Sequence, residues 1–203
     1  MTIARPDAEK RRHILTAAAS VFARHGLHAA RMDEIAQAAG VAKGTLYLYF
    51  SSKEAIIEAL LDQTFTPEFD WLADLVHTDG SAYARLIAYT ERSLLLLEQV
   101  QAMQLLPLLA EYYILATRNE RARQILQHYN STARRYMEAI FQQGIDQGEF
   151  RPLDPQVMYV CYATMLDGLV LGDHIDEYRL PLNERIRAAV QLLLDGFRYR
   201  PPI

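Results

Sequence analysis

A run of seven residues from Lys43 to Tyr49 gathers the side chains most able to contact a nucleic acid. In a helix, Leu46 and the following Phe50 share one face at a spacing of i and i+4. The outward residues are then Lys43, Gly44, Thr45, Tyr47, Leu48 and Tyr49. Amines and hydroxyls reach phosphates and base edges, an exposed leucine can touch a thymine methyl, and a glycine near a helix N-terminus admits a phosphate. The set suits a major groove, although both tyrosines could instead pack against other helices.

A second short helix is needed to hold this one in place, and the sequence provides it. Residues 33–39 form an amphipathic segment with Ile35, Ala36 and Ala39 on one face. Gly40 can adopt the left-handed conformation that ends a helix, and the small Ala36 allows a close approach of the second helix. The two segments therefore predict a helix-turn-helix with a tight turn.

The stretch AAGVAKGTLYLYFSSKE resembles the recognition region of the tetracycline-repressor-like (TetR) family of bacterial transcription regulators. Motif-level similarity runs from Ile14 to about Leu60, and beyond it the match is to length and helix pattern. The resemblance implies an all-α fold with an N-terminal three-helix DNA-binding domain, residues 1–52. It also implies a larger domain, residues 53–203, that dimerises and usually binds a small molecule.

Carried over from the family, the positions that contact DNA are Lys43, Gly44, Thr45, Tyr47, Leu48, Tyr49 and Lys53. Two departures stand out. The family often has a hydroxyl that caps a helix and touches phosphate, where this chain has Ala30 and Ala42. We expect Arg31 and Lys43 to supply phosphate contacts in their place.

Composition bounds the remaining possibilities. With 203 residues and 51% hydrophobic content, the chain can bury a substantial core. No apolar run reaches the ~18 residues needed to span a bilayer, and the first residues lack the apolar stretch of a signal peptide, so we expect a cytoplasmic protein without a membrane partner. The single Cys161 lies among apolar residues and is interpreted as a small buried hydrophobe.

Charge is unevenly distributed along the chain. The net charge is -4, yet residues 1–55 carry 8 Lys/Arg against 5 Asp/Glu and the remainder carries 13 against 20. The helix-turn-helix end is therefore basic and the rest is acidic. Such an arrangement favours docking on DNA by one end.

Periodicity and end signals predict helices along the whole chain. The first helix spans residues 5–25, and a capping box from Ser51 to Glu54 begins a fourth helix, which we expect to break at Thr66-Pro67. Further helices are predicted at 81–100, at 104–116, from a second box at Thr117 to a stop at Gly148, at 156–172 and at 183–198.

The last two helices carry apolar residues on more than one face. One face can serve the protomer core and the other a partner, which indicates a homodimer through a two-fold four-helix interface. A central helix pair within a monomer is the alternative.

Aromatic and methionine residues are frequent on the middle helices, where such residues usually fill a core. In a family whose larger domain is a receptor, they could line a mostly apolar pocket. The candidates are Trp71, Tyr89, Met103, Tyr112, Tyr136 and Met137. Glu111 is a possible polar group of that pocket, and Asp167 could hydrogen-bond a ligand or a dimer partner.

The sequence contains no P-loop, no G-x-G-x-x-G, no G-x-S-x-G and no H-E-x-x-H, so it offers little support for an enzyme. Residues 173–177 gather potential metal ligands but read as a solvated loop, so no metal or cofactor is expected. The resulting hypothesis is a dimeric regulator, a repressor released from a palindromic operator by a small, largely apolar or aromatic effector. The alternative is a DNA-binding module controlled by a protein partner with no small-molecule effector.

Overall fold

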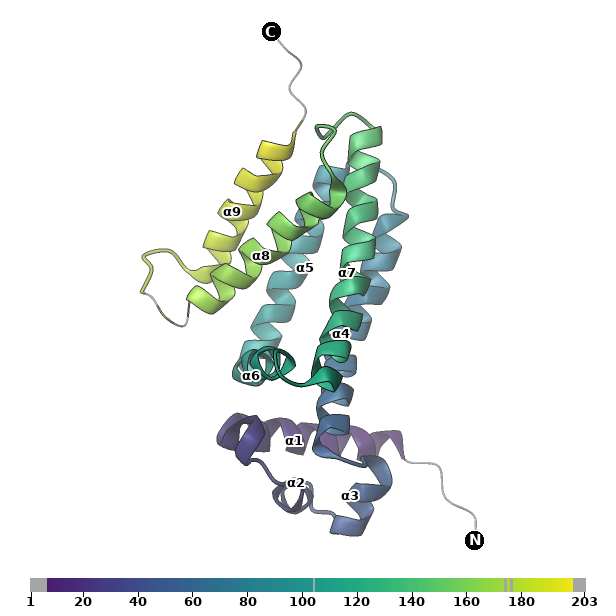
Figure 1. Ribbon diagram of the computed structural model, residues 1–203, viewed down its shortest axis with the longest axis vertical. Helices are drawn as coiled ribbons and strands as arrows, with labels where there is room; N and C mark the ends of the chain where they lie inside the picture. Colours follow the sequence, from purple (N-terminus) through teal and green to yellow (C-terminus); the bar gives the residue numbers. More distant parts are fainter. Residues whose placement is uncertain (1–6, 104, 174, 176, 199–203) are drawn as a thin grey trace. The chain divides into compact units, whose positions relative to one another are not determined.

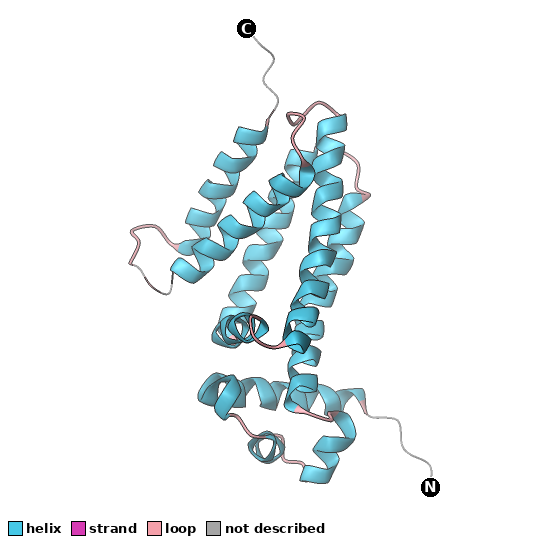
Figure 2. Ribbon diagram, in the orientation of Figure 1, coloured by secondary structure: helices cyan, strands magenta, loops and turns pink. Residues whose placement is uncertain are grey.

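The computed structural model describes residues 7–103, 105–173, 175 and 177–198, and helices joined by short loops make up this part of the chain (Figures 1 and 2). The helices are α1 (Ala8–Ala29), α2 (Met32–Ala38), α3 (Lys43–Tyr49), α4 (Lys53–Val76), α5 (Ala82–Ala102), α6 (Leu106–Ala116), α7 (Glu120–Asp146), α8 (Pro155–Gly172) and α9 (Leu182–Phe197). No strand occurs among the described residues, so the all-α prediction is confirmed. Arg5 and Gln104, placed in helices by the sequence analysis, lie outside the described residues.

Contacts divide the chain into two compact units. The first comprises residues 1–68 and 97–129, and the second comprises residues 69–96 and 130–203. This division reflects which residues contact one another, whereas the predicted boundary at residue 52 separates a DNA-binding domain from an effector-binding domain. The functional boundary stays a prediction.

The helix-turn-helix forms as predicted within the first unit. Leu46 of α3 and Phe50, which directly follows α3, are buried, as are Ile35 and Ala36 of α2; α3 packs on α2, and α2 packs on α1. Gly40 has a φ of 60°, the left-handed conformation that the turn needs. Figure 1 shows α1, α2 and α3 beside the first turns of α4. Local periodicity was sufficient to predict this arrangement because its buried residues lie close together in the sequence.

Two predicted capping boxes are wrong in detail. The cap of α4 is Ser52, whose Oγ accepts the N–H of Ala55 at 3.2 Å, so the S-x-x-E pattern starting at Ser51 is one residue out of step. The cap of α7 is Asn119, whose Oδ1 accepts the N–H of Ala122 at 3.0 Å. Thr117 instead donates its hydroxyl to the carbonyl of Ile114 at the end of α6. Both helices nevertheless begin within three residues of the predicted starts.

The predicted break at Pro67 is also wrong, because α4 continues through it to Val76. A proline inside a helix removes one backbone hydrogen bond and crowds the preceding turn. Leu72, Leu75 and Val76 beyond it are buried. Burial of this apolar face offsets the missing hydrogen bond, so the helix persists.

The second unit contains the start of α5, the end of α7, and α8 packed against α9. Glu149 binds the start of α5 in this unit. Its carboxylate accepts hydrogen bonds from the Ser81 hydroxyl at 2.7 Å and from the N–H groups of Ala82 and Tyr83 at 3.0 and 3.1 Å. Desolvation opposes the charge, but these hydrogen bonds prevail and lower the pKa of Glu149. The predicted cap at Ser81 is confirmed, because its Oγ accepts the N–H of Ala84.

Cys161 is exposed on α8, and its predicted burial is wrong for the single chain. Helical periodicity identifies an apolar face without saying what covers it. Among the described residues, no single helix combines the length and hydropathy needed to cross a membrane; α5 and α6 pass that test only when joined, and they are bent by 99° at their junction.

Candidate nucleic-acid interface

The outward face of α3 presents most of the residues predicted to contact DNA. Leu48 is 76% exposed and Tyr47 is 45% exposed, while Lys43 and Gly44 are also at the surface. Thr45 and Tyr49 are half-buried. The alternative in which Tyr47 packs inside the protomer is therefore wrong, and its ring and hydroxyl are available to a partner.

Lys43 is held by an acid from the neighbouring helix. Its Nζ lies 2.7 Å from Oδ1 of Asp33 on α2, and Arg31 lies 3.9 Å from the other oxygen of Asp33. The hydrogen bond from Lys43 lowers the pKa of Asp33, and the same bond raises the pKa of Lys43. Two cations thus flank one carboxylate at the start of the helix-turn-helix. Sequence reasoning had not assigned this role to Asp33, although an acid in the first turn of α2 was the available signal.

Tyr49 joins α3 to the start of α1. Its hydroxyl oxygen accepts the N–H of Asp7 at 3.2 Å, while Asp7 caps α1 by accepting the N–H of Glu9 at 2.9 Å. Arg11 of α1 lies over the Phe50 ring at 5.2 Å. Tyr49 therefore helps to orient the recognition helix, and its predicted DNA contact must share a hydroxyl already engaged with the backbone.

The end of α1 is bent at Gly26, where φ is 72° and the helix is interrupted before a last turn. Glu111 of α6 accepts the freed N–H of Leu27 at 2.7 Å. A Cβ on Gly26 would lie 3.0 Å from the Oε1 atom of Glu111, so the carboxylate approaches a bare backbone. This contact ties α6 to the DNA-binding helices within the first unit.

Lys53 holds the other end of the same turn. Its Nζ donates to the carbonyls of Leu27, His28 and Ala30 at 2.5, 3.2 and 3.3 Å. A carboxylate at the N-terminal side of a turn and an ammonium at its C-terminal side both match the turn's dipole. We call Glu111, the turn 26–30 and Lys53 the α1 clamp. The geometry gives Lys53 a positioning role, and its predicted DNA contact stays a prediction.

The candidate effector residues occupy varied surroundings. Tyr112 is buried and lines a small apolar hollow, of about 10 Å³, between α4, α5 and α6; its other lining residues are Ile57, Leu60, Leu61, Thr64, Val100, Leu105, Leu108 and Leu109. Met103 of the first unit is 45% exposed, and Glu111 serves the α1 clamp.

The other candidates belong to the second unit. Met137 is fully buried, and Asp167 is exposed on α8. The Trp71 ring faces Arg92 at 5.5 Å, the Tyr136 ring faces Arg135 at 4.8 Å, and the Tyr89 ring lies 6.1 Å from Tyr162. Each candidate thus has its own environment, and the apolar hollow includes one of the eight, Tyr112.

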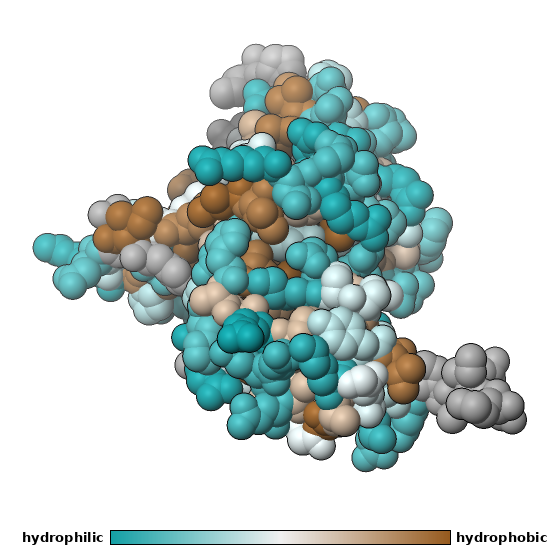
Figure 3. Space-filling view, turned by 60° about the horizontal axis from the view of Figure 1, so that its bottom comes forward, coloured by the Kyte–Doolittle hydropathy of each residue, from teal (hydrophilic) through white to brown (hydrophobic). Residues whose placement is uncertain are grey.

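Exposed apolar residues also mark α8 and α9. Val157, Val160 and Leu171 on α8 are 56%, 47% and 54% exposed, and Leu192 on α9 is 75% exposed. In the space-filling view of Figure 3, apolar surface appears in brown at several separate places within a mainly polar surface. Exposed apolar side chains on two helices that pack on each other are candidates for contact with a partner.

Comparisons with known proteins agree with this geometry. Residues 14–60 match the model for bacterial regulatory proteins of the tetR family, and residues 85–178 match a tetracyclin repressor-like C-terminal domain. The chain is 32% identical over 164 residues to the uncharacterized HTH-type transcriptional regulator YfiR of Bacillus subtilis, covering 80% of this chain and 78% of that protein. It is 30% identical over 151 residues to the HTH-type transcriptional repressor KstR2 of Mycobacterium tuberculosis, covering 74% of each.

Solved structures share the fold. The complex of SmeT with triclosan superposes with a TM-score of 0.81 at 20% identity, over 95% of this chain and 93% of that one. FadR of Bacillus subtilis in complex with stearoyl-CoA gives a TM-score of 0.72 at 24% identity, over 92% and 99%. From the helix-turn-helix, the two matched family models and the relatives that align along most of their length, we conclude that the chain belongs to the TetR family of transcriptional regulators.

Proposed function

We propose that this regulator is a homodimeric repressor that binds a palindromic operator and is released by a small, largely apolar or aromatic effector. The observation that carries the DNA-binding part is the exposed face of α3, with Tyr47 and Leu48 turned outward and Lys43 held at the start of the helix. Two such helices about one helical turn apart, roughly 34 to 36 Å, would enter successive major grooves. A protein that acts on chromosomal DNA works in the cytoplasm of a bacterium, which is the location we propose.

Selection of operators from random duplexes, followed by titration at fixed salt, tests this part. Tyr47→Ala should lower operator affinity by about 1–3 kcal/mol if the ring and hydroxyl meet a base edge. Tyr113→Ala on α6 is the matched control, since that tyrosine is 47% exposed, close to the 45% of Tyr47. Equal operator affinity for wild type and both variants would remove α3 from the interface.

The dimer is proposed to form through the exposed apolar residues of α8 and α9. Leu192→Glu should yield monomers in sedimentation, because a charge in an apolar interface is left without a partner. Ile114→Glu on α6, where the side chain is 66% exposed, should remain dimeric. Cys161 offers a second readout, as the chain's single cysteine should react with iodoacetamide more slowly in the wild-type dimer than in the Leu192 variant.

The effector is proposed to enter the apolar hollow beside Tyr112 by widening it. Two structural relatives were solved with ligands that have a large apolar part, triclosan for SmeT and the acyl chain of stearoyl-CoA for FadR, which supports a largely apolar or aromatic class here. A bound effector at a hundredfold excess over its Kd stabilises the folded state by ~2.7 kcal/mol. A thermal-shift screen with long-chain acyl-CoA thioesters and chlorinated phenols should therefore find a stabiliser that also weakens operator binding. A protein partner as the controlling signal is supported if no such compound raises the melting temperature.

A further inference from the structure

A second hollow lies between the outer faces of α4 and α7, within the first unit, and shares no residue with the apolar hollow. Its volume is about 230 Å³. Its lining residues are Glu58 and Asp62 from α4, with Arg121, Gln124, Ile125, His128 and Tyr129 from α7. A small organic molecule fits this space, and the polar groups decide which kind.

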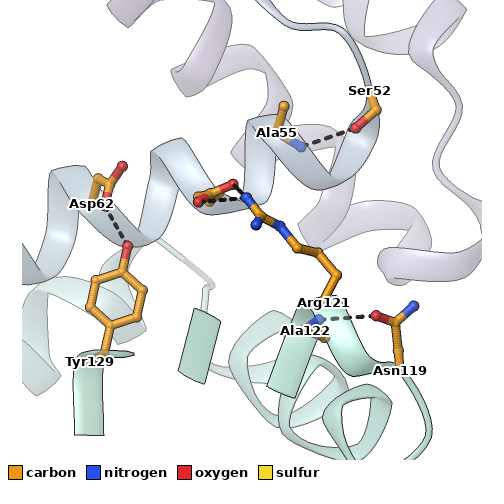
Figure 4. Close-up of polar contacts among 8 residues, drawn as sticks. Ser52, Ala55, Asp62, Asn119, Arg121, Ala122 and Tyr129 are labelled. Carbon is orange, nitrogen blue, oxygen red and sulfur yellow. Dashed lines mark hydrogen bonds and ion pairs between the residues drawn. The ribbon is translucent and has the colours of Figure 1, made fainter. Parts of the chain in front are cut away.

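One carboxylate is fixed on one side and open on the other. Tyr129 is 7% exposed, and its hydroxyl donates to Oδ1 of Asp62 at 2.5 Å, as Figure 4 shows. Desolvation raises the pKa of Tyr129, and the bond to Asp62 raises it further, so the phenol stays protonated and donates to the carboxylate. Across the described residues, Oδ2 of Asp62 has no protein donor. This oxygen is free to accept a hydrogen bond from a ligand.

The other two charged groups neutralise each other. Nη2 of Arg121 lies 2.9 and 3.1 Å from the two carboxylate oxygens of Glu58, and Figure 4 shows the arginine extended from α7 toward α4. Because Arg121 and Glu58 pair with each other, the hollow retains one uncompensated negative charge, which belongs to Asp62. An anion would have to displace Glu58 from Arg121 and would face Asp62, whereas a cation meets an open acceptor.

An aromatic and apolar wall completes the hollow. The Tyr129 ring lies 5.7 Å from Phe65 and 5.6 Å from His128, measured between centroids, and Ile125 adds an aliphatic surface. Aromatic rings attract organic cations through their quadrupoles, most effectively where water is partly excluded. The wall therefore suits the apolar portion of a molecule whose charged end reaches Asp62.

We propose that this hollow binds a small organic ammonium cation, whose N–H donates to Oδ2 of Asp62 while its apolar part packs on Tyr129 and Ile125. This site is separate from the effector pocket proposed above, and its occupation does not require DNA binding. The charge of Asp62 selects a cation over a neutral molecule of the same shape. The pair formed by Arg121 and Glu58 stays closed.

Isothermal titration calorimetry of the full chain with benzylammonium chloride tests the site, with benzyl alcohol and benzoate as the neutral and anionic counterparts. Benzylammonium should bind one site per protomer at least about tenfold more tightly than benzyl alcohol, because a hydrogen bond to a charged group exceeds a neutral one. Asp62→Asn should lower the benzylammonium affinity at least about tenfold. The asparagine oxygen can still accept the Tyr129 hydroxyl, so the packing is retained.

Two further variants act as controls. Asp70→Asn removes one charge from the same helix outside the hollow and should leave the affinity unchanged. Arg121→Gln makes the hollow more negative and should leave benzylammonium affinity equal or higher. Absence of benzylammonium binding at millimolar concentration, equal affinity for wild type and Asp62→Asn, or tighter binding of benzoate that Arg121→Gln abolishes would each overturn the proposal.

Discussion

Replacing Lys53 with methionine separates two roles for a lysine that follows the recognition helix. The family resemblance makes Lys53 a DNA contact. In the structure its Nζ donates to the carbonyls of Leu27, His28 and Ala30, so it holds the end of α1 in place. Methionine keeps the length and most of the apolar stem of the side chain but removes the charge and all three donors.

The magnitude follows from those three bonds. A hydrogen bond to a charged group contributes about 1.5–3 kcal/mol, but Lys53 is half-buried and water can replace part of what is lost. We therefore expect a net loss of about 2 kcal/mol in the free energy of unfolding. For a protein of this size, that loss lowers the melting temperature by roughly 4–8 °C. The dependence of operator affinity on salt should not change, because no phosphate contact is removed.

Lys43→Met is the matched comparison, since Lys43 is exposed and forms its ion pair with Asp33 at the surface. Its melting temperature should stay close to wild type, while the slope of log affinity against log salt should become shallower by about one unit. Circular dichroism melts and anisotropy titrations over a salt series measure both quantities. The positioning role of Lys53 is refuted if Lys53→Met melts like wild type and loses one unit of salt slope.

Three further substitutions test the packing. Gly26→Ala should lower the free energy of unfolding in urea by about 1–3 kcal/mol, because φ is 72° at this position and the new Cβ would lie 3.0 Å from the Glu111 carboxylate. Unchanged stability would mean that Glu111 does not pack closely on Gly26 in the α1 clamp. Gly144→Ala should cost about 1–3 kcal/mol, since its Cβ would clash with the Phe150 ring, and a wild-type urea midpoint would contradict that packing. Glu149→Gln should destabilise the protein near neutral pH. The difference in stability between wild type and variant should shrink as the pH falls below 4.5, the ordinary glutamate pKa, and through the lower pKa of Glu149 in the folded state. Thermal melts in which the two proteins differ equally at every pH would contradict the role of the charge.

The helix-turn-helix could be predicted because its determinants are local. Gly40, Ala36 and Leu46 lie within about three helical turns of one another, and each acts through backbone conformation or through a neighbour's close approach. Both helices were therefore placed to within a residue. The outward face of α3 followed from the same periodicity, since fixing Leu46 and Phe50 inside leaves Tyr47 and Leu48 outside.

The first residues of helices and the course of α4 were harder to predict from the sequence, because several local conformations have similar energies. Ser51 and Ser52 can both cap a helix, and the geometry selects Ser52. Thr117 could have capped α7, but its hydroxyl bonds back to the carbonyl of Ile114, as short hydroxyl side chains often do. Pro67 would end an isolated helix, yet buried residues further along hold α4 together. In each case tertiary packing decides between options that the sequence leaves open.

Polar side chains were the least predictable, because their partners lie far away along the chain. Glu111 was expected to serve a ligand, but it binds the N–H of Leu27, 84 residues earlier. An acid beside aromatic residues has the same local pattern in either role. The available signal was Gly26, since a glycine with positive φ inside a helix leaves the next N–H without its usual acceptor. A search for acids that could reach such an N–H would have pointed toward the α1 clamp.

Cys161 shows the corresponding limit for apolar side chains. The pattern of α8 correctly predicts apolar faces, but the same residues would be buried whether they pack inside one protomer or against a second copy. On the single chain, Cys161, Val157 and Val160 are exposed, so the protomer core does not account for that face. Covering it by a two-fold related copy removes apolar surface from water at about 25 cal/mol per Å², which favours association. The error about Cys161 therefore supports the proposed dimer, because it locates the apolar residues that the protomer leaves uncovered.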